Sequence, residues 1–403
     1  SLWETATGKR LFQLEGPWHR TGWSLVCAFA PDGRTFAAAA AENVIHLRDA
    51  ATGNELQQFR GHDGEVDVLF FLADGKTLAS VIQEQMICLW DVADGKERGA
   101  PLKLTGSVRA FSPDGRIVAV HHSRGRDRAL HLQETATGRE IRRVAETFGP
   151  FCAFSPDGKT LAVYADGQYA PDDRPILLLE VATGKVRMKL AGHGAMACRP
   201  MVFSADGRML ASAGSNMTTL VWDATGRMRG GRFETATLSP KELSDSWAAL
   251  AGDDPAEAYR AIWALTASPE QTLPLLKDHL RPLAAPDPKA TARRLADLDS
   301  DDFTVREKAE KELGELGDLV EPALCKALDE GPSPEVRHRV EQLLENLNEP
   351  RGLQGLRSLE VLERIGTPGA EKVLREIARG APQARLTQEA NASLERLSRR
   401  PSP

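Results

Sequence analysis

The chain has 403 residues, with 51 Lys and Arg against 57 Asp and Glu, and its formal net charge is −6. This length predicts two or three domains, and the weak negative charge gives no electrostatic basis for binding nucleic acid or an anionic membrane. The five cysteines are scattered without a Cys-x-x-Cys pair, and no segment approaches the ~18 apolar residues of a membrane-spanning helix. We therefore expect no disulfide framework, no zinc site, no membrane span and a cytoplasmic location.

From the N-terminus to about residue 232, short apolar segments alternate with two recurring turn sequences. Asp-Gly turns of this kind between apolar segments are typical of consecutive antiparallel strands. The second turn recurs in steps of 45, 42, 43, 46 and 42 residues, a period typical of four-stranded propeller blades. The first turn (PDG or ADG) begins at Pro31, Ala73, Pro113, Pro156 and Ala205, and the second (ATG or ADG) at Ala6, Ala51, Ala93, Ala136, Ala182 and Ala224.

Two repeats carry fuller marks, which are Gly61-His62 with Trp90-Asp91 and Gly192-His193 with Trp222-Asp223. These repeats resemble WD40 repeats. The resemblance implies a β-propeller of five blades over residues 1–232. Because residues 1–14 read as the third and fourth strands of a further blade, we expect the propeller to be cut from a longer one. A five-bladed ring closed by a strand over residues 11–14 is the alternative.

The resemblance also gives the histidines and tryptophans of these marks a structural role. In WD40-like blades, a His, a strand-two Ser or Thr, a turn Asp and a strand-three Trp form a buried hydrogen-bonded chain. His62, Ser80 and Trp90 match this pattern in one repeat, and His193, Ser212 and Trp222 match it in another. Asn216 stands at the Asp position of the second set, and Glu84 or Gln85 at that of the first.

A partner surface is predicted where the loops between repeats become irregular, because binding residues concentrate in such loops. The irregular loops are residues 15–23, 123–128 and 165–174, on the face that carries the turn after strand two. Their Trp, Tyr and Arg side chains are the types that dominate interaction hot spots. The candidate partner-binding residues are Trp18, Trp23, Arg124, Arg126, Arg128 and Tyr169. The alternative is that these loops vary because nothing constrains them.

After Phe233 the apolar period changes from two to 3.6, which predicts helices. Ser239-Pro240-Lys241-Glu242 reads as a capping box, and Asp254-Pro255, Ser268-Pro269, Ser333-Pro334 and Thr367-Pro368 read as further helix starts. We expect a helical linker or bundle over residues 233–296. Over residues 297–403, Val305-Ala309-Leu313-Leu316, Val336-Val340-Leu344-Leu347 and Leu386-Ala390-Leu394-Leu397 repeat one apolar spacing. This pattern resembles HEAT-type repeats, and a plain helical bundle is the alternative.

No sequence motif of catalysis, cofactor binding or metal binding is present. The chain lacks a phosphate-binding GxxxxGK[ST], a GxGxxG, an HExxH and a GxSxG. Adjacent residues of a strand point to opposite faces, so His121 and His122 are not expected to bind one metal ion. The acidic segment from Asp297 to Asp302 lacks the Gly and terminal Glu of an EF-hand and reads as a helix start.

Taken together, the patterns predict a non-catalytic protein–protein interaction scaffold or sensory module, with no cofactor. The chain resembles the WD40-plus-helical regions of large bacterial proteins, particularly planctomycete ones. The resemblance implies that a kinase or sigma-factor-like domain could precede this chain, which would then be the regulatory part of a larger effector. An enzyme with its site in the propeller channel is a further alternative, because residues distant in sequence could converge there.

Overall fold

The computed structural model divides the chain into two compact units. The first comprises Ser1–Gly184 with Lys189–Trp222, and the second comprises Lys185–Met188 with Asp223–Pro403. The structure describes residues 2–3, 7, 9–13, 20–21, 24–40, 43–72, 74–83, 85–122, 129–135, 137–144, 148–165, 175–191, 199–214, 218–347 and 352–399. The predicted boundaries at 232/233 and 296/297 stay predictions.

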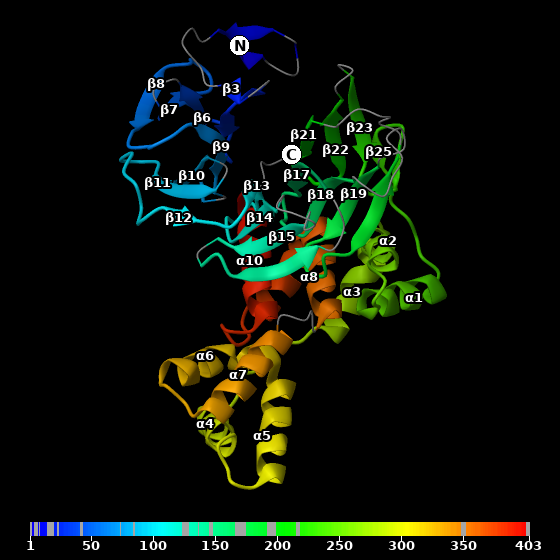
Figure 1. Ribbon diagram of the computed structural model, residues 1–403. Helices are drawn as coiled ribbons and strands as arrows, with labels where there is room; N and C mark the ends of the chain where they lie inside the picture. Colours follow the sequence, from blue (N-terminus) through cyan, green and yellow to red (C-terminus); the bar gives the residue numbers. More distant parts are fainter. Residues whose placement is uncertain are drawn as a thin grey trace. The chain divides into compact units, whose positions relative to one another are not determined.

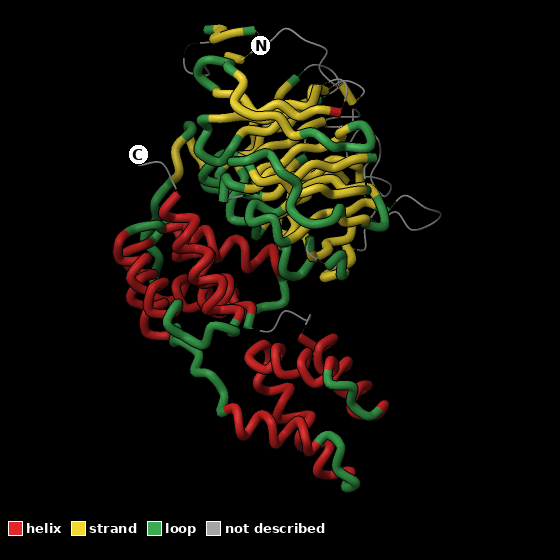
Figure 2. The backbone as a smooth tube through the Cα atoms, turned by 90° about the vertical axis from the view of Figure 1, so that its left-hand side faces the viewer, coloured by secondary structure: helices red, strands yellow, loops and turns green. Residues whose placement is uncertain are grey.

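Five β-sheets follow one another along the chain, as the turn repeats predicted (Figures 1 and 2). Blade one contains β5 (Cys27–Phe29), β6 (Thr35–Ala40), β7 (Val44–Asp49) and β8 (Glu55–Phe59), and blade two contains β9 (Val66–Phe71), β10 (Thr77–Ile82), β11 (Met86–Asp91) and β12 (Leu102–Lys103). Blade three contains β13 (Ser107–Phe111), β14 (Ile117–His121), β15 (Leu130–Glu134) and β16 (Glu140–Val144). Blade four contains β17 (Phe148–Phe154), β18 (Thr160–Ala165), β19 (Ile176–Glu180) and β20 (Val186–Leu190), and blade five contains β21 (Arg199–Phe203), β22 (Met209–Ala213) and β23 (Thr219–Asp223). The five-bladed propeller is therefore confirmed.

The first turn of each blade is built by its aspartate. In blade one the Asp32 carboxylate accepts the backbone N–H of Arg34 at 2.9 Å, and Gly33 has a φ of +68°. The same bond recurs in the other blades, from Lys76 to Asp74, Arg116 to Asp114, Lys159 to Asp157 and Arg208 to Asp206. An aspartate followed by a glycine that accepts a left-handed φ is what this tight turn requires.

The cores of the blades lie around their second strands. Every residue of β10 and β18 is buried, and β6 is buried from Phe36 to Ala40. A strand covered on both faces has no solvent side, which explains why these segments are mostly apolar and do not alternate between apolar and charged residues. The Phe12 ring of β2 (Arg10–Phe12) stacks on Phe36 of β6 at 6.4 Å between centroids.

Short two-stranded sheets lie before and after the blades. At the start of the chain, β1 (Leu2–Trp3) pairs with β2, and β3 (Arg20–Thr21) pairs with β4 (Ser24–Leu25). After blade five, β24 (Met228–Arg229) pairs with β25 (Arg232–Phe233). The first of these pairs corresponds to the partial blade expected over residues 1–14.

The second unit is helical. Its α-helices are α1 (Pro240–Ala251), α2 (Pro255–Thr266), α3 (Pro269–His279), α4 (Pro288–Asp297), α5 (Phe303–Leu316), α6 (Glu321–Asp329), α7 (Pro334–Leu347), α8 (Leu353–Ile365), α9 (Pro368–Ile377) and α10 (Arg385–Arg399), with a 3₁₀ helix at Gly317–Val320. Helices α8, α9 and α10 pack with α1, α2 and α3, whereas α4 to α7 pack with one another (Figure 1). Among the described residues, no helix is long and apolar enough to cross a membrane.

The predicted helix starts are confirmed, with one change in the chemistry of capping. Ser239 and Glu242 form the expected capping box at α1, and Asp254 caps α2 through the N–H groups of Ala256 and Glu257. Asp302, at the end of the acidic segment, caps α5. Ser268 precedes α3 as predicted, but its hydroxyl donates to the carbonyl of Ala236 instead of capping the helix.

Within α4 to α7, the repeated apolar positions form one core. Ala309 and Leu313 of α5 are buried in the same cluster as Val336 and Val340 of α7. Leu298, which follows α4, and Leu324 of α6 belong to the same cluster. The helical period read from the sequence is thus the spacing of a buried face. The HEAT-type assignment of these helices stays a prediction.

Candidate functional site

The loop residues predicted to bind a partner are outside the part of the chain that the structure describes. This holds for all of them, namely Trp18, Trp23, Arg124, Arg126, Arg128 and Tyr169. Their role stays a prediction. The described residues present other features, which fall into polar chains inside the blades, a charged centre in the helical unit and two apolar surfaces.

Blade two contains a hydrogen-bonded chain of three side chains. The Trp90 indole N–H donates to Ser80 Oγ at 2.8 Å, and Ser80 Oγ lies 2.9 Å from His62 Nε2. His62 Nδ1 lies 3.1 Å from the carbonyl oxygen of Asn43, which can only accept, so Nδ1 carries the proton. Burial lowers the pKa of His62 although this backbone hydrogen bond opposes the shift. The imidazole is therefore neutral, and Nε2 accepts from the Ser80 hydroxyl.

The corresponding chain of blade five is described only in part. The Trp222 indole N–H donates to Ser212 Oγ at 2.8 Å, but His193 and Asn216 lie outside the described residues. Trp90 is 2% exposed, whereas Trp222 is only half-buried. The same sequence mark therefore sits in a more open environment in the last blade.

A second polar pair recurs in blades one and three. His46 Nδ1 lies 2.6 Å from the Glu55 carboxylate, and His131 Nδ1 lies 2.7 Å from that of Glu140. Each pair joins the third strand to the fourth across nine residues. The ring of His122 lies against the ring of His131, with 4.1 Å between their centroids. The neighbouring His121 is not part of this contact. Within the described ranges, no group of three or more His, Cys, Asp or Glu is placed to hold a metal ion.

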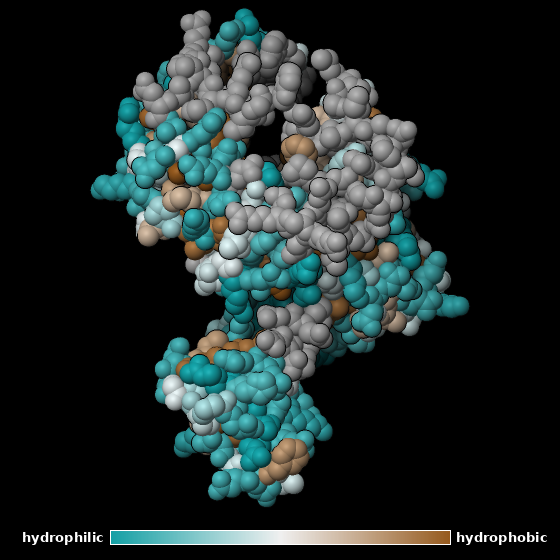
Figure 3. Space-filling view, in the orientation of Figure 1, coloured by the Kyte–Doolittle hydropathy of each residue, from teal (hydrophilic) through white to brown (hydrophobic). Residues whose placement is uncertain are grey.

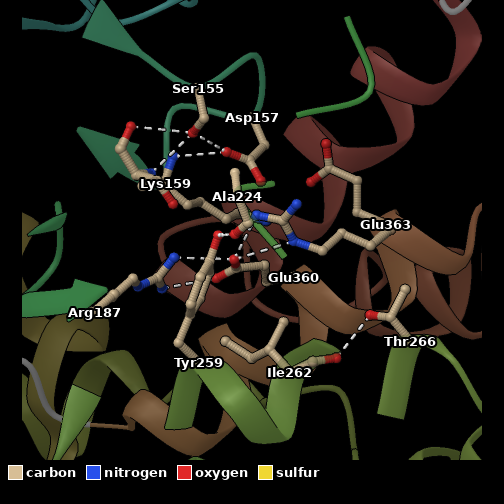
Figure 4. A network of polar contacts seen from close by, with 12 residues as sticks. Ser155, Asp157, Lys159, Arg187, Ala224, Tyr259, Ile262, Thr266, Glu360 and Glu363 are labelled. Atoms are coloured by element: carbon tan, nitrogen blue, oxygen red, sulfur yellow. Dashed lines mark hydrogen bonds and ion pairs between the residues drawn. The ribbon is translucent and has the colours of Figure 1, made fainter. Parts of the chain in front are cut away.

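Among the helices that pack together as α1–α3 and α8–α10, α8 is central, and it is buried from Arg357 to Arg364. Both side chains of the Arg187–Glu360 pair are 2% exposed, and their two hydrogen bonds measure 2.9 and 3.0 Å (Figure 4). Glu360 also accepts from Arg364 at 2.8 Å, and the Arg364 guanidinium lies 4.3 Å from the centre of the Trp263 ring. Arg187 comes from β20, yet it belongs to the helical unit.

The other charged residues of α8 each bind a different neighbour. Arg357 donates to the carbonyls of Leu250 and Gly252 at the end of α1, at 2.9 and 2.7 Å. Glu363 accepts two hydrogen bonds from Arg396 of α10, both of 2.8 Å. Because buried charges are stable only when paired, these contacts fix the helix in one orientation among its neighbours. Each charged side chain of α8 therefore has a structural role, because each one binds another group of the fold.

A groove runs between α4 and α6. Its volume is about 720 Å³, and about half of the residues that line it are prolines and alanines, among them Pro288, Ala296, Pro322 and Ala323. The Thr291 hydroxyl is buried beside it without a hydrogen-bond partner among the described residues. Figure 3 shows a strip of hydrophobic surface over α6. The lining also includes Asp299, Lys326 and Glu330, so the groove combines apolar and charged walls.

The last blade exposes aliphatic side chains. Val202 of β21 is 63% exposed, Val221 of β23 is 65% exposed, and Met209 of β22 is 38% exposed. On the same strands Met201, Phe203 and Leu210 are buried. The alternation shows that one side of this sheet packs inward while the other presents apolar residues to solvent.

Sequence reasoning did not find the charged centre around α8 or the repeated His–Glu pairs. The pairs had a visible signal, because His-Leu and Glu flank the Ala-Thr-Gly turn at equal distances in HLRDAATGNE and HLQETATGRE. The α8 centre had none. Its segment LRSLEVLERI reads as an ordinary amphipathic helix, and Arg187 lies 173 residues before Glu360.

Comparison with known proteins gives one family match. The family described as "WD domain, G-beta repeat" matches residues 184–223, which contain β20 to β23. No curated protein matches the sequence significantly. Among solved structures, hydrazine synthase of Kuenenia stuttgartiensis aligns at 20% identity and a TM-score of 0.39, over 53% of this chain and 59% of that one. A similarity of this size carries no inference about fold or activity.

Proposed function

We propose that this chain, a WD40-type β-propeller followed by a helical region, is a non-catalytic protein–protein interaction scaffold or sensory module. WD40 propellers are typically scaffolds that bind other proteins, and the observation that supports this role here is the exposed apolar side of blade five. Val202 of β21 and Val221 of β23 are each more than 60% exposed, on the two strands that flank β22 in a sheet whose other side is packed. Clustered apolar residues on the surface mark interaction sites.

The buried polar groups fit the same proposal. Among the described residues, His62, Glu360 and Glu363 are bound to Ser, Arg or backbone groups that hold the fold together. A rigid framework of this kind keeps a binding surface in place without taking part in chemistry.

Affinity capture with the full chain tests the proposal. Wild type immobilised on a matrix is expected to retain a discrete protein from a lysate of the source organism. A V202K/V221K variant places two charges on the blade-five surface, whereas A296K places one beside the α4–α6 groove and A248K places one on exposed α1. Loss of the captured protein in V202K/V221K, with retention in A296K and A248K, would support the propeller surface.

Loss in A296K alone would assign binding to the helical unit and still support a scaffold. If wild type retains nothing beyond what an empty matrix retains, at several salt concentrations, the proposal is wrong. Circular dichroism of each variant ensures that lost capture does not reflect lost folding.

A further inference from the structure

Small side chains line both walls of the groove between α4 and α6. Ala292 and Ala296 of α4 are exposed one turn apart, and Ala323 and Ala327 of α6 repeat this spacing on the other wall. Residues four apart lie on one face of a helix, so each wall presents a shallow row of alanines. Side chains this small leave space for larger side chains of another helix to enter between the two walls.

Thr291 of α4 adds an unsatisfied polar group to the same groove. Its side chain is among those that line the groove, and the residue is only 6% exposed. Its hydroxyl has no hydrogen-bond partner in the part of the chain that the structure describes. Because nearly all buried polar groups of folded proteins are paired, this hydroxyl indicates a place where a bound partner supplies the missing group.

The charges along the groove do not balance. Lys326 and Glu330 lie 3.7 Å apart and compensate each other. Asp299, two residues after the end of α4, accepts the Ser333 hydroxyl at 2.8 Å and forms no ion pair with any described residue. One carboxylate is therefore left without a cation. It favours an occupant with a basic side chain and opposes an anionic one such as a fatty acid.

The walls also select the backbone conformation of the occupant. The backbone groups of α4 and α6 bond within their own helices except at the ends, and prolines and alanines have no side-chain donor or acceptor. An extended segment in this groove would lose hydrogen bonds of its own backbone to water without gaining new ones. An α-helix satisfies these groups internally, so it can bury one face here without this cost.

We propose that the α4–α6 groove binds an amphipathic helix of a partner protein, an inference that rests on the proposed function. The helix inserts aliphatic side chains with i, i+4 and i+7 spacing between the two alanine rows. It places a Lys or Arg against Asp299 and a polar side chain against the Thr291 hydroxyl. The partner is thus a protein with a basic amphipathic helix, not an extended segment, a lipid or a small anion.

A displayed peptide library, selected on the full chain, tests the site. Its members are helices of about 16 residues, or about 24 Å, with aliphatic residues on one face and Lys, Arg, Glu or Gln elsewhere. Members that bind A296K are removed before selection on wild type. A second library carries proline at every fifth position and cannot form helices. We expect enrichment from the first library only, of sequences with aliphatic residues at helical spacing and a Lys or Arg near one end.

The most enriched helix, labelled with fluorescein, is then titrated with the full chain and followed by fluorescence anisotropy. A296K should weaken binding by about tenfold or more, because the new charge would be buried beneath the helix. A248K is the matched control on exposed α1 and should change the Kd less than about twofold.

Two further variants test the polar contacts. T291V should weaken binding by about fivefold, the effect of one neutral hydrogen bond. It should leave the urea midpoint of the free chain unchanged, since the hydroxyl has no partner there. D299N should weaken binding by about two- to fivefold, as expected for an exposed ion pair. D245N, on α1, is its control and should have no effect.

The proposal is overturned if no helix is enriched on wild type over A296K, or if the proline library is enriched equally. Acidic residues in place of basic ones, or full binding to D299N, would overturn it as well. A dimer that A296K dissociates, seen by sedimentation, would assign the groove to a second copy and also overturn it. If V202K/V221K abolishes capture from lysate while A296K does not and no helix is enriched, the scaffold function stands and this inference fails.

Discussion

Ser80 is the residue on which the polar chain of blade two depends. Its Oγ accepts from Trp90 and donates to His62, and all three side chains are more than nine-tenths buried. Replacing Ser80 with Ala leaves two buried groups without a partner, which costs about 1–3 kcal/mol per group that stays unsatisfied.

S80A is therefore expected to lower the urea midpoint of the propeller clearly. S212A is the comparison in blade five, where Trp222 is only half-buried, and its effect should be smaller. Equal losses of stability in the two variants would contradict the assigned difference in environment. Circular dichroism in the near ultraviolet reports on the two tryptophans at the same time.

His62 predicts a dependence of stability on pH. Burial lowers the pKa of His62 below the value of about 6.5 that it has in an unfolded chain. Between the lowered pKa and about 6.5 the unfolded state binds more protons, so the free energy of unfolding falls as the pH falls through this window. Urea unfolding of wild type and H62Q at pH 7.5 and 5.5 should show a smaller loss in H62Q. The same loss in both proteins would mean that His62 does not contribute.

Helix α8 shows how a single element can organise the helices that pack around it. Its charges bind α1 through Arg357, α10 through Glu363 and β20 through Glu360, so each neighbour is fixed by a different residue. A helix that is apolar all round could rotate or slide among its neighbours, whereas paired charges specify one register. The Arg364 guanidinium over Trp263 adds a contact to α2.

Glu360 is the most sensitive position of this helix. E360Q removes the charge that pairs with two buried guanidinium groups, and breaking a buried pair costs about 3–5 kcal/mol. E371Q is the control, because Glu371 pairs with Arg375 on the surface of α9, where the loss should stay below about 1 kcal/mol. Thermal unfolding of the full chain compares the two. If E360Q unfolds at the temperature of E371Q, the pair is not a structural centre.

The sequence was informative wherever a feature is local. The Asp-Gly turns and the capping box at Ser239 each depend on residues within one turn, so spacing alone indicates them. The His62–Ser80–Trp90 chain lies within one blade and was predicted from the resemblance to WD40 repeats. The contact of Arg187 with Glu360 depends on how two distant segments meet, and no periodicity reports it.

At the scale of the whole molecule, the two compact units do not coincide with two continuous segments. Lys185–Met188 belongs to the helical unit although it is part of β20, and the chain enters that unit again at Asp223. Within the unit, Tyr259 donates to the carbonyl of Ala224 at 2.8 Å, and the Arg187 guanidinium lies 5.1 Å from the centre of its ring. The helical unit therefore requires residues from within the fourth blade to complete its charged centre.

This division predicts that a piece spanning residues 223–403 is incomplete. Without Arg187, Glu360 keeps Arg364 as its partner, but the bidentate pair is absent and water takes its place. E360Q should then cost less in the piece than the about 3–5 kcal/mol expected in the full chain, because only one of the two guanidinium groups loses its partner. Urea unfolding of the four proteins, with and without the substitution, measures both values. An equal loss in the piece and in the full chain would show that Arg187 does not contribute, and that Arg364 alone accounts for the stability that the Glu360 carboxylate supplies.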